Sequence, residues 1–314
     1  MLCGDKLFSV MNMQIRTDLA LEAKEMYTGS DDDGILSSTK SYDGIEINSV
    51  WITNEKGSAN LGKPMGTYIT LEMPKVAERN PDFSKEVTEK FSEEIRELVK
   101  PYSGKGSILV AGLGNWNITP DALGPKVISG LLVTRHLKEY MPDKFDDSVN
   151  GVCAISPGVL GITGIETNEI IKGIVERVKP SAVIAIDALA SRRVERVNTT
   201  IQISDTGISP GAGVGNRRGE LSEKTIGVPV IAVGVPTVVD AATIAMDALE
   251  TIMDDDEDSH KIVRDLLSPY YKNLIVAPKN MDAMITDMST IIAAGLNMAL
   301  QDGLSYEDAL NFKA

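Results

Sequence analysis

The chain has 314 residues, which is enough for one large α/β domain or for two small ones. With 43% hydrophobic, 24% charged and 5% aromatic residues, its composition is that of a folded globular protein and excludes the disordered, collagen-like and coiled-coil classes. The formal net charge is -14, so the long-range field repels a phosphate backbone, and we expect no nucleic-acid partner.

Cysteine and histidine are scarce, with only Cys3, Cys153, His136 and His260 in the sequence. Their spacing fits neither a disulfide framework nor a zinc cage, and it favours a reducing, cytoplasmic compartment. The N-terminal residues contain no apolar run of signal-peptide quality, and no stretch approaches ~18 uninterrupted apolar residues. We therefore expect a cytoplasmic protein without a membrane partner.

The first hundred residues predict an appendage followed by a small β patch and a helix. Residues 1–45 are polar and rich in turns, with one short helical pattern at 19–26. Residues 45–73 contain short alternating apolar runs broken by Gly57 and by Lys63-Pro64, which predicts antiparallel strands. An apolar stripe at helical spacing over 84–100 predicts a helix that covers a sheet.

The centre of the chain alternates strands and helices. Continuous apolar runs at 107–113, 181–186 and 228–235 predict strands buried on both faces, and a shorter run lies at 151–155. Helical patterns are found at 122–137, 167–178, 240–253 and 281–300. This alternation predicts an α/β fold with a mostly parallel sheet sandwiched by helices, in which ligands bind beyond the carboxyl ends of the strands.

The loop after the first buried strand concentrates polar side chains. It reads GLGNWNITPDALGP and carries Asn115, Asn117 and Asp121 just before a helix begins. Such a cluster is typical of a ligand site at this edge of a sheet. The structural alternative is that Thr119 or Asp121 only caps the helix.

A second carboxylate, Asp187, terminates the apolar run SAVIAI. Burying a carboxylate is costly unless it is paired, hydrogen-bonded or functional. If both strands belong to one parallel sheet, Asp121 and Asp187 share an edge, where they can divide acid and base duties or hold a divalent metal ion. The alternative for Asp187 is a salt bridge to Arg192 or Arg193.

The segment 198–218 is rich in glycine and in hydrogen-bond donors, but it lacks the strand-to-helix context of a dinucleotide site. We expect it to form a loop that lines a pocket or reaches a neighbouring subunit, with Thr199 and Arg217 as substrate-binding residues beside Asn115 and Asn117. Nucleophile chemistry has less support, because no GxSxG motif is present and Cys153 lies in an apolar run typical of a core thiol.

The loop GLGNWNITPDALGP and the segments AIDALASRRVERVNTTIQISDTGI and GVPVIAVGVPTVVDA closely resemble the germination protease family of spore-forming bacteria. Members of this family are endopeptidases that degrade small acid-soluble spore proteins. The resemblance implies a fold similar to that of the hydrogenase-maturation endopeptidases and a homotetramer. By motif match, it also places the essential aspartates of the family at Asp121 and Asp187.

The resemblance further implies a zymogen that removes its own N-terminal segment. The sequence Thr17-Asp18-Leu19-Ala20-Leu21-Glu22 is similar to the Thr-Glu-Phe-Ala-Ser-Glu sites that the family cuts in its substrates, with an acidic residue before the cut bond (P1) and a large apolar residue after it (P1′). Residues 1–18 would then be a propeptide, cut between Asp18 and Leu19, and residues 19–314 a single peptidase domain.

Two other functions remain open on the residues alone. Sheets of this kind also occur in other hydrolases and in nucleoside phosphorylases that act on small molecules. The same loops could also bind an anion without catalysis. Phosphorolysis calls for a basic phosphate-binding loop, whereas this loop carries Asp121 and no lysine before Lys126. The sequence indicates no certain cofactor, and a divalent metal between the two aspartates stays open.

Overall fold

The computed structural model describes residues 17–29, 33–141, 143, 149–211, 219–241, 243–244 and 274–311. Within these residues the strands form one sheet in the order β1-β2-β3-β7-β8-β6-β4-β5, with β9 paired to β8. The strands are β1 (Ile35–Tyr42), β2 (Ile45–Ile52), β3 (Gly66–Glu72), β4 (Ile108–Gly112), β5 (Val152–Ile155), β6 (Ala182–Ser191), β7 (Thr200–Ser204), β8 (Val230–Asp240) and β9 (Ile275–Val276).

The sheet is mixed, with a parallel and an antiparallel half. Strands β5, β4, β6 and β8 are parallel neighbours, as the apolar runs predict. Strands β1, β2 and β3 are antiparallel, and β7 joins the two halves because it pairs antiparallel with both β3 and β8. The β patch predicted at 45–73 is therefore part of the same sheet.

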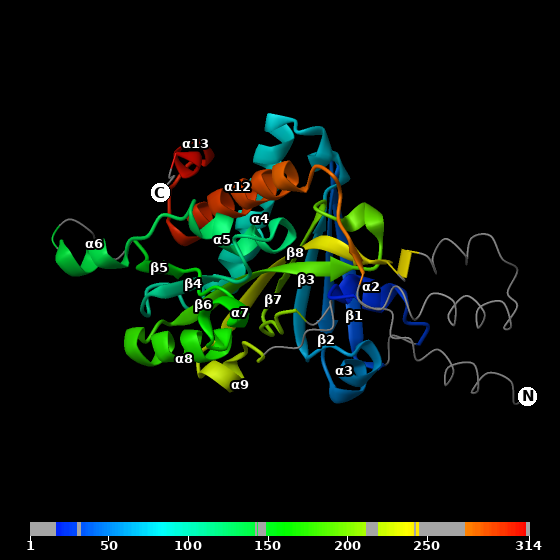
Figure 1. Ribbon diagram of the computed structural model, residues 1–314, viewed down its shortest axis with the longest axis horizontal. Coiled ribbons are helices and arrows are strands. Elements are labelled where there is room, and N and C mark those ends of the chain that lie inside the picture. The colour runs from blue at the N-terminus through cyan, green and yellow to red at the C-terminus, as the bar shows by residue number, and fades with distance from the viewer. Residues whose placement is uncertain are drawn as a thin grey trace, which may run out of the picture.

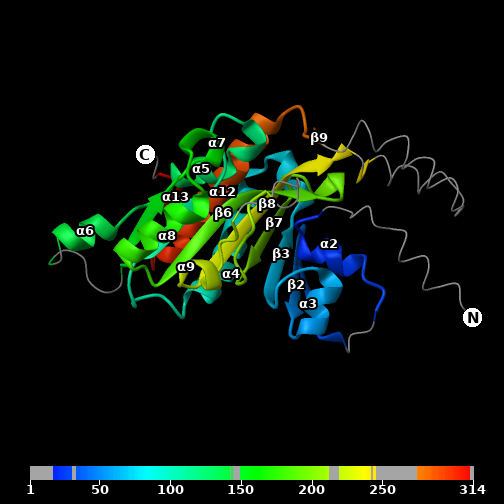
Figure 2. The same cartoon turned by 60° about the horizontal axis from the view of Figure 1, so that its bottom comes forward.

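Helices cover both faces of the sheet, so the predicted α/β sandwich is confirmed (Figure 1). The upper face in Figure 1 carries α4 (Pro81–Val99), α5 (Leu123–Ile128), α12 (Met281–Leu300) and α13 (Tyr306–Leu310). The other face carries α7 (Leu160–Thr163), α8 (Thr167–Val178) and α9 (Glu223–Ile226), with α2 (Ala20–Glu25) and α3 (Glu55–Leu61) beside the antiparallel half (Figure 2). Short elements complete the chain: η2 (Pro74–Glu78), η3 (Thr119–Asp121), α6 (Arg135–Tyr140) and η5 (Val194–Arg196).

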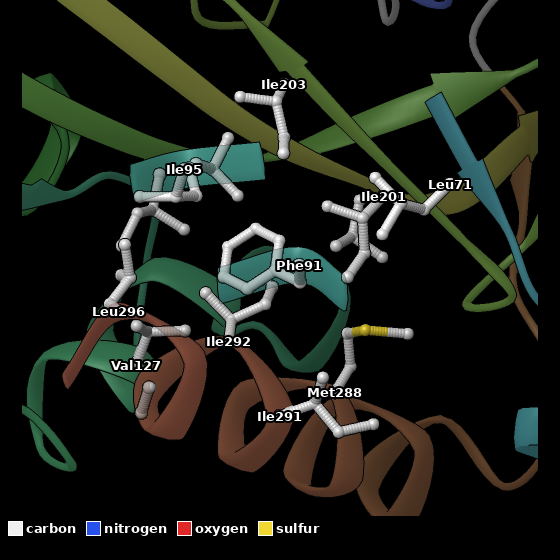
Figure 3. Close-up of a cluster of buried hydrophobic side chains, with 14 of the residues drawn as sticks. Leu71, Phe91, Ile95, Val127, Ile201, Ile203, Met288, Ile291, Ile292 and Leu296 are labelled. Carbon is white, nitrogen blue, oxygen red and sulfur yellow. The ribbon is translucent and has the colours of Figure 1, made fainter. Parts of the chain in front are cut away.

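The largest core lies between the sheet and the helix pair α4 and α12. Figure 3 shows the ring of Phe91 at its centre, between Ile292 of α12 and the isoleucines of β7. A Cβ atom on Gly295 would lie 2.4 Å from this ring, so the close approach of α12 to Phe91 requires glycine there. The α12 helix is long and apolar enough to cross a membrane by length and composition, but 67% of its apolar window is buried inside the structure, which is typical of a core helix.

Two expectations about the elements are wrong. The helix predicted over 122–137 is broken into α5 and α6, because the N–H of Leu132 donates to Asn297 Oδ1 (2.8 Å) and that of Thr134 to the carbonyl of Val152 (2.9 Å). The loop predicted from Asn198 onwards contains β7, in which Ile201 and Ile203 face the core and the alternating polar residues face the other side. The helix predicted at 240–253 lies mostly outside the described residues.

Candidate active site

Asp187 lies inside β6, which continues to Ser191, and not at the end of the strand as predicted. The side chain is 4% exposed, and its backbone lies opposite Gly234 of β8. The neighbouring strand β4 ends at Gly112, which pairs with Ile186. Asp187 is therefore the first residue of β6 beyond the carboxyl end of β4, which is the edge that the sequence predicts.

Asp121 reaches the same edge through a loop that folds back on itself. The N–H of Asn115 donates to the carbonyl of Asp121 (2.9 Å), and Gly114 has a φ of 110°. A Cβ atom on Gly114 would lie 2.1 Å from that carbonyl oxygen and 3.0 Å from Oδ1 of Asp121, so only glycine fits. The η3 turn that carries Asp121 packs against β6 and β8, which brings the two aspartate-bearing elements together.

Close backbone contact fixes this loop on the sheet. A Cβ atom on Gly112 would lie 2.3 Å from the carbonyl oxygen of Gly124, and one on Gly124 would lie 2.3 Å from that of Leu113. The first turn of α5 therefore rests directly on the end of β4. The N-cap of α5 is Ala122, which makes no side-chain cap, and the hydroxyl of Thr119 donates to Asp282 Oδ1 of α12 (3.0 Å) and not to the first turn of α5.

The other predicted site residues make local contacts or lie outside the described residues. Asn115 Oδ1 accepts the N–H of Asn117 (3.0 Å) and thereby shapes the loop, while Asn117 is exposed. The hydroxyl of Thr199 donates to the carbonyl of Glu195 in its own turn. Arg217 falls in the segment 212–218, which the structure does not describe. Cys153 packs partly buried against the core, as expected, and burial raises the pKa of its thiol.

A cavity of about 410 Å³ opens over β7 and β8 on the face of the sheet opposite α4 and α12. Gly234, the register partner of Asp187, lines it together with Gln202 and Ser204 of β7. Tyr68 also lines it, and burial raises the pKa of this phenol to about 12, so its hydroxyl stays protonated at neutral pH. Gln202 and Ser204 come from β7, for which the sequence predicts a loop.

The predicted cleavage segment is docked on this part of the protein, so the expectation of an appendage is wrong for the described residues from Thr17 onwards. The N–H of Asp18 donates to the carbonyl of Ala190 (2.9 Å), and the N–H of Ala190 donates to Asp18 Oδ2 (2.9 Å). Leu19 is extended and fully buried, and α2 begins directly after it. Asp18 lines the same cavity as Gly234.

Two side chains hold the carbonyl oxygen of Asp18. Lys63 Nζ donates to it at 2.9 Å and Gln202 Nε2 at 3.2 Å. Lys63 Nζ also donates to the carbonyl of Thr17 (3.1 Å), and Gln202 Oε1 accepts the N–H of Ala20 (2.7 Å). Burial lowers the pKa of Lys63, against the opposing effect of the Asp18 and Glu22 carboxylates.

An ion cluster anchors α2 behind the cleavage segment. Arg196, which is 5% exposed, pairs with Glu22 (3.3 Å), Glu25 (2.6 Å) and Glu72 (2.8 Å). Burial raises the pKa of Glu25, but the hydrogen bond and charge of Arg196 outweigh this effect and leave the pKa below its ordinary value. The Arg193 side chain pairs with Glu25 (3.6 Å).

Lys63, Gln202 and Arg196 were missed by the sequence analysis. The alternation of Thr200-Ile201-Gln202-Ile203-Ser204 is a strand signal that would have placed Gln202 on the face opposite the core isoleucines. Nothing in the local sequence around Lys63 or Arg196 points to their partners. A metal ion at this edge would have two carboxylates, Asp121 and Asp187, and the described residues contain no group of three or more Asp, Glu, His or Cys suited to hold one.

Comparison with known proteins identifies the relatives of this chain. A family model described as germination protease matches residues 13–255 and 253–313. The germination protease of Clostridium acetobutylicum is 48% identical, with 94% of this chain and 97% of the relative covered, and that of Bacillus subtilis is 42% identical, with 94% and 95% covered. Among solved structures, a [NiFe] hydrogenase maturation protease HycI from Thermococcus kodakarensis is similar at 18% identity and a TM-score of 0.31, covering 63% of this chain and 97% of that one.

Proposed function

The chain belongs to the germination protease family and is a protease. On this premise, we propose that it is a self-processing endopeptidase that initiates the degradation of small acid-soluble spore proteins in the spore cytoplasm. The observation that carries the proposal is the docked bond between Asp18 and Leu19. It has an acidic P1 residue and a buried apolar P1′ residue. Its Asp18 lines the same cavity as Gly234, and Gly234 is the strand partner of Asp187.

The proposed chemistry assigns the acid and base roles to Asp121 and Asp187. One carboxylate takes a proton from the attacking water, and the other, protonated, supplies a proton to the leaving nitrogen. These roles require one of the two carboxylates to be protonated and the other to be ionised. A divalent ion, if bound, would be held by the same two carboxylates.

The two alternatives have less support. A phosphorylase or an anion-binding module needs a cation that is available to a phosphate or another anion. In the cavity of the unprocessed chain, the ammonium group of Lys63 is engaged by the carbonyl groups of Thr17 and Asp18. The cavity therefore has the character of a peptide site.

Self-processing at Asp18 provides the direct test. Full-length protein incubated at mildly acid pH should lose residues 1–18 and begin at Leu19, as measured by intact mass and N-terminal sequencing. Mild acid should favour the step because protonation relieves the repulsion between an acidic P1 side chain and a protein of net charge -14.

Two variants control this experiment. Asp18→Lys should block trimming, because it replaces the acidic P1 residue, while a separately made chain of residues 19–314 should still cut spore-protein peptides. A different start after activation, or trimming by Asp187→Asn at the parental rate, would contradict the proposal.

We expect the protein to act as a homotetramer. The loops at the carboxyl edge expose large apolar side chains, among them Trp116 (57% exposed) after β4 and Ile162 (59%) in α7, which suit burial between subunits. Light scattering should give about four times the 33.8 kDa mass of the chain. A monomer at micromolar concentration would contradict this assembly.

A further inference from the structure

We propose that Lys63 and Gln202 form a clamp that binds the backbone of the cleavage segment and positions the Asp18–Leu19 bond for self-processing. The inference rests on the proposed function and adds to it the two residues that hold the bond to be cut. Both lie outside the aspartate-bearing loops, and they come from separate parts of the chain, Lys63 from the turn before β3 and Gln202 from β7.

The clamp contacts peptide groups on both sides of the bond. Lys63 Nζ binds the carbonyl groups of Thr17 and Asp18, while Gln202 binds the carbonyl of Asp18 through its Nε2 and the N–H of Ala20 through its Oε1. These contacts use only backbone atoms of the segment. They therefore fix its position along the cavity independently of its side chains.

The P1 side chain and the P1′ side chain are held separately. The carboxylate of Asp18 accepts the N–H of Ala190, and Leu19 is fully buried. Each of the two side chains thus has its own site beside the backbone contacts of the clamp. Removal of the clamp should slow processing without changing which bond is cut.

The oxygen that the clamp binds is the one whose charge increases in the reaction. Water forms a bond to the carbonyl carbon of Asp18 and gives its proton to an aspartate, and the carbonyl oxygen becomes negative. The C–N bond to Leu19 then breaks, the nitrogen takes a proton, and an Asp18 carboxylate and a Leu19 amine remain. An ammonium and an amide N–H on that oxygen stabilise its charge without giving up a proton.

The clamp acts before attack as well as during it. Asp18 is bound at Ala190, three residues along β6 from Asp187, and at ~3.3 Å per residue these backbone positions are about 10 Å apart. A clamp that keeps the segment at the cavity raises the effective concentration of the bond near the aspartates.

The test is the rate of self-processing of the full-length chain under activating conditions, followed by intact mass. Lys63→Met should trim at least about tenfold more slowly than the parent. The Lys63 contact is already present before attack, so only its strengthening in the transition state contributes to the rate and is lost in the variant. Lys63→Arg, which keeps the charge and the donors, should recover most of the rate. Lys100→Met is the matched control, since Lys100 is exposed and pairs with Glu97 on α4.

Gln202→Glu is a second, independent variant. It keeps the size of the side chain and an acceptor for the Ala20 N–H, but it removes the donor to the Asp18 carbonyl, so it should also slow trimming. Equal or faster trimming by folded Lys63→Met and Gln202→Glu would overturn the clamp. Failure of the parental chain to trim itself would instead overturn the proposed self-processing, so the two failures are distinguishable.

Discussion

Replacing Asp187 with Asn is expected to lower peptidase activity by at least ~10²-fold while the protein still folds and assembles. The substitution keeps the shape of a side chain that is 4% exposed and removes its titratable charge. Asp121→Asn should have a similar effect, because each residue is assigned one half of the proton transfer. The measurement is cleavage of a peptide containing Thr-Glu-Phe-Ala-Ser-Glu, with the oligomeric state followed in parallel.

Asp302→Asn provides the matched control for this experiment, because Asp302 is an exposed carboxylate beyond the end of α12. It should retain parental activity. A variant of Asp121 or Asp187 that cuts the peptide at nearly the parental rate would remove that residue from the mechanism. A variant that no longer assembles would be compared again at matched oligomeric state before its activity is interpreted.

Replacing Arg196 with Met is expected to lower the free energy of unfolding by about 3–5 kcal/mol. The arginine is nearly buried and pairs with the carboxylates of Glu22, Glu25 and Glu72, of which Glu22 is 1% exposed. Without the guanidinium group, these three carboxylates repel one another in a poorly solvated place. Denaturant unfolding of full-length protein measures the loss.

Arg79→Met serves as the control, because Arg79 forms an exposed ion pair with Asp287 (2.7 Å). Such surface pairs contribute about 0–1 kcal/mol, so this variant should remain close to the parent. A loss of equal size in both variants would mean that the cluster at Arg196 is no more important than a surface pair.

The pH dependence of the Arg196 effect follows from the lowered pKa of Glu25. A carboxyl whose folded pKa is depressed contributes stability above its ordinary value of 4.5, and this contribution is lost as the pH falls through the lower folded pKa. The difference in stability between parent and Arg196→Met should therefore be largest at neutral pH and should shrink below pH 4.5. Acid thus weakens the anchor of α2, the helix that directly follows the Asp18–Leu19 bond.

Local sequence patterns predict the parallel half of the fold and the aspartate-bearing edge. The apolar runs at 181–186 and 228–235 predict β6 and β8 because both faces of these strands are covered, and the spacing over 281–300 predicts α12 because one long helix fills the core. The resemblance of the motifs around Asp121 and Asp187 to one family is confirmed by a family match over most of the chain. Asp187 could be selected because it ends an apolar run, and Asp121 because it lies in the polar loop that follows another apolar run.

Long-range contacts decided the rest. β7 is polar on one face, and it becomes a strand because β3 and β8 both pair with it. The cleavage segment is held by Lys63, which lies 45 residues from Asp18, and by Gln202, which lies 182 residues from Ala20. Arg196 and Glu25 are 171 residues apart. No local period or motif records such pairs, because a lone lysine, glutamine or arginine gains its role only when the folded sheet brings a carbonyl or a carboxylate to it.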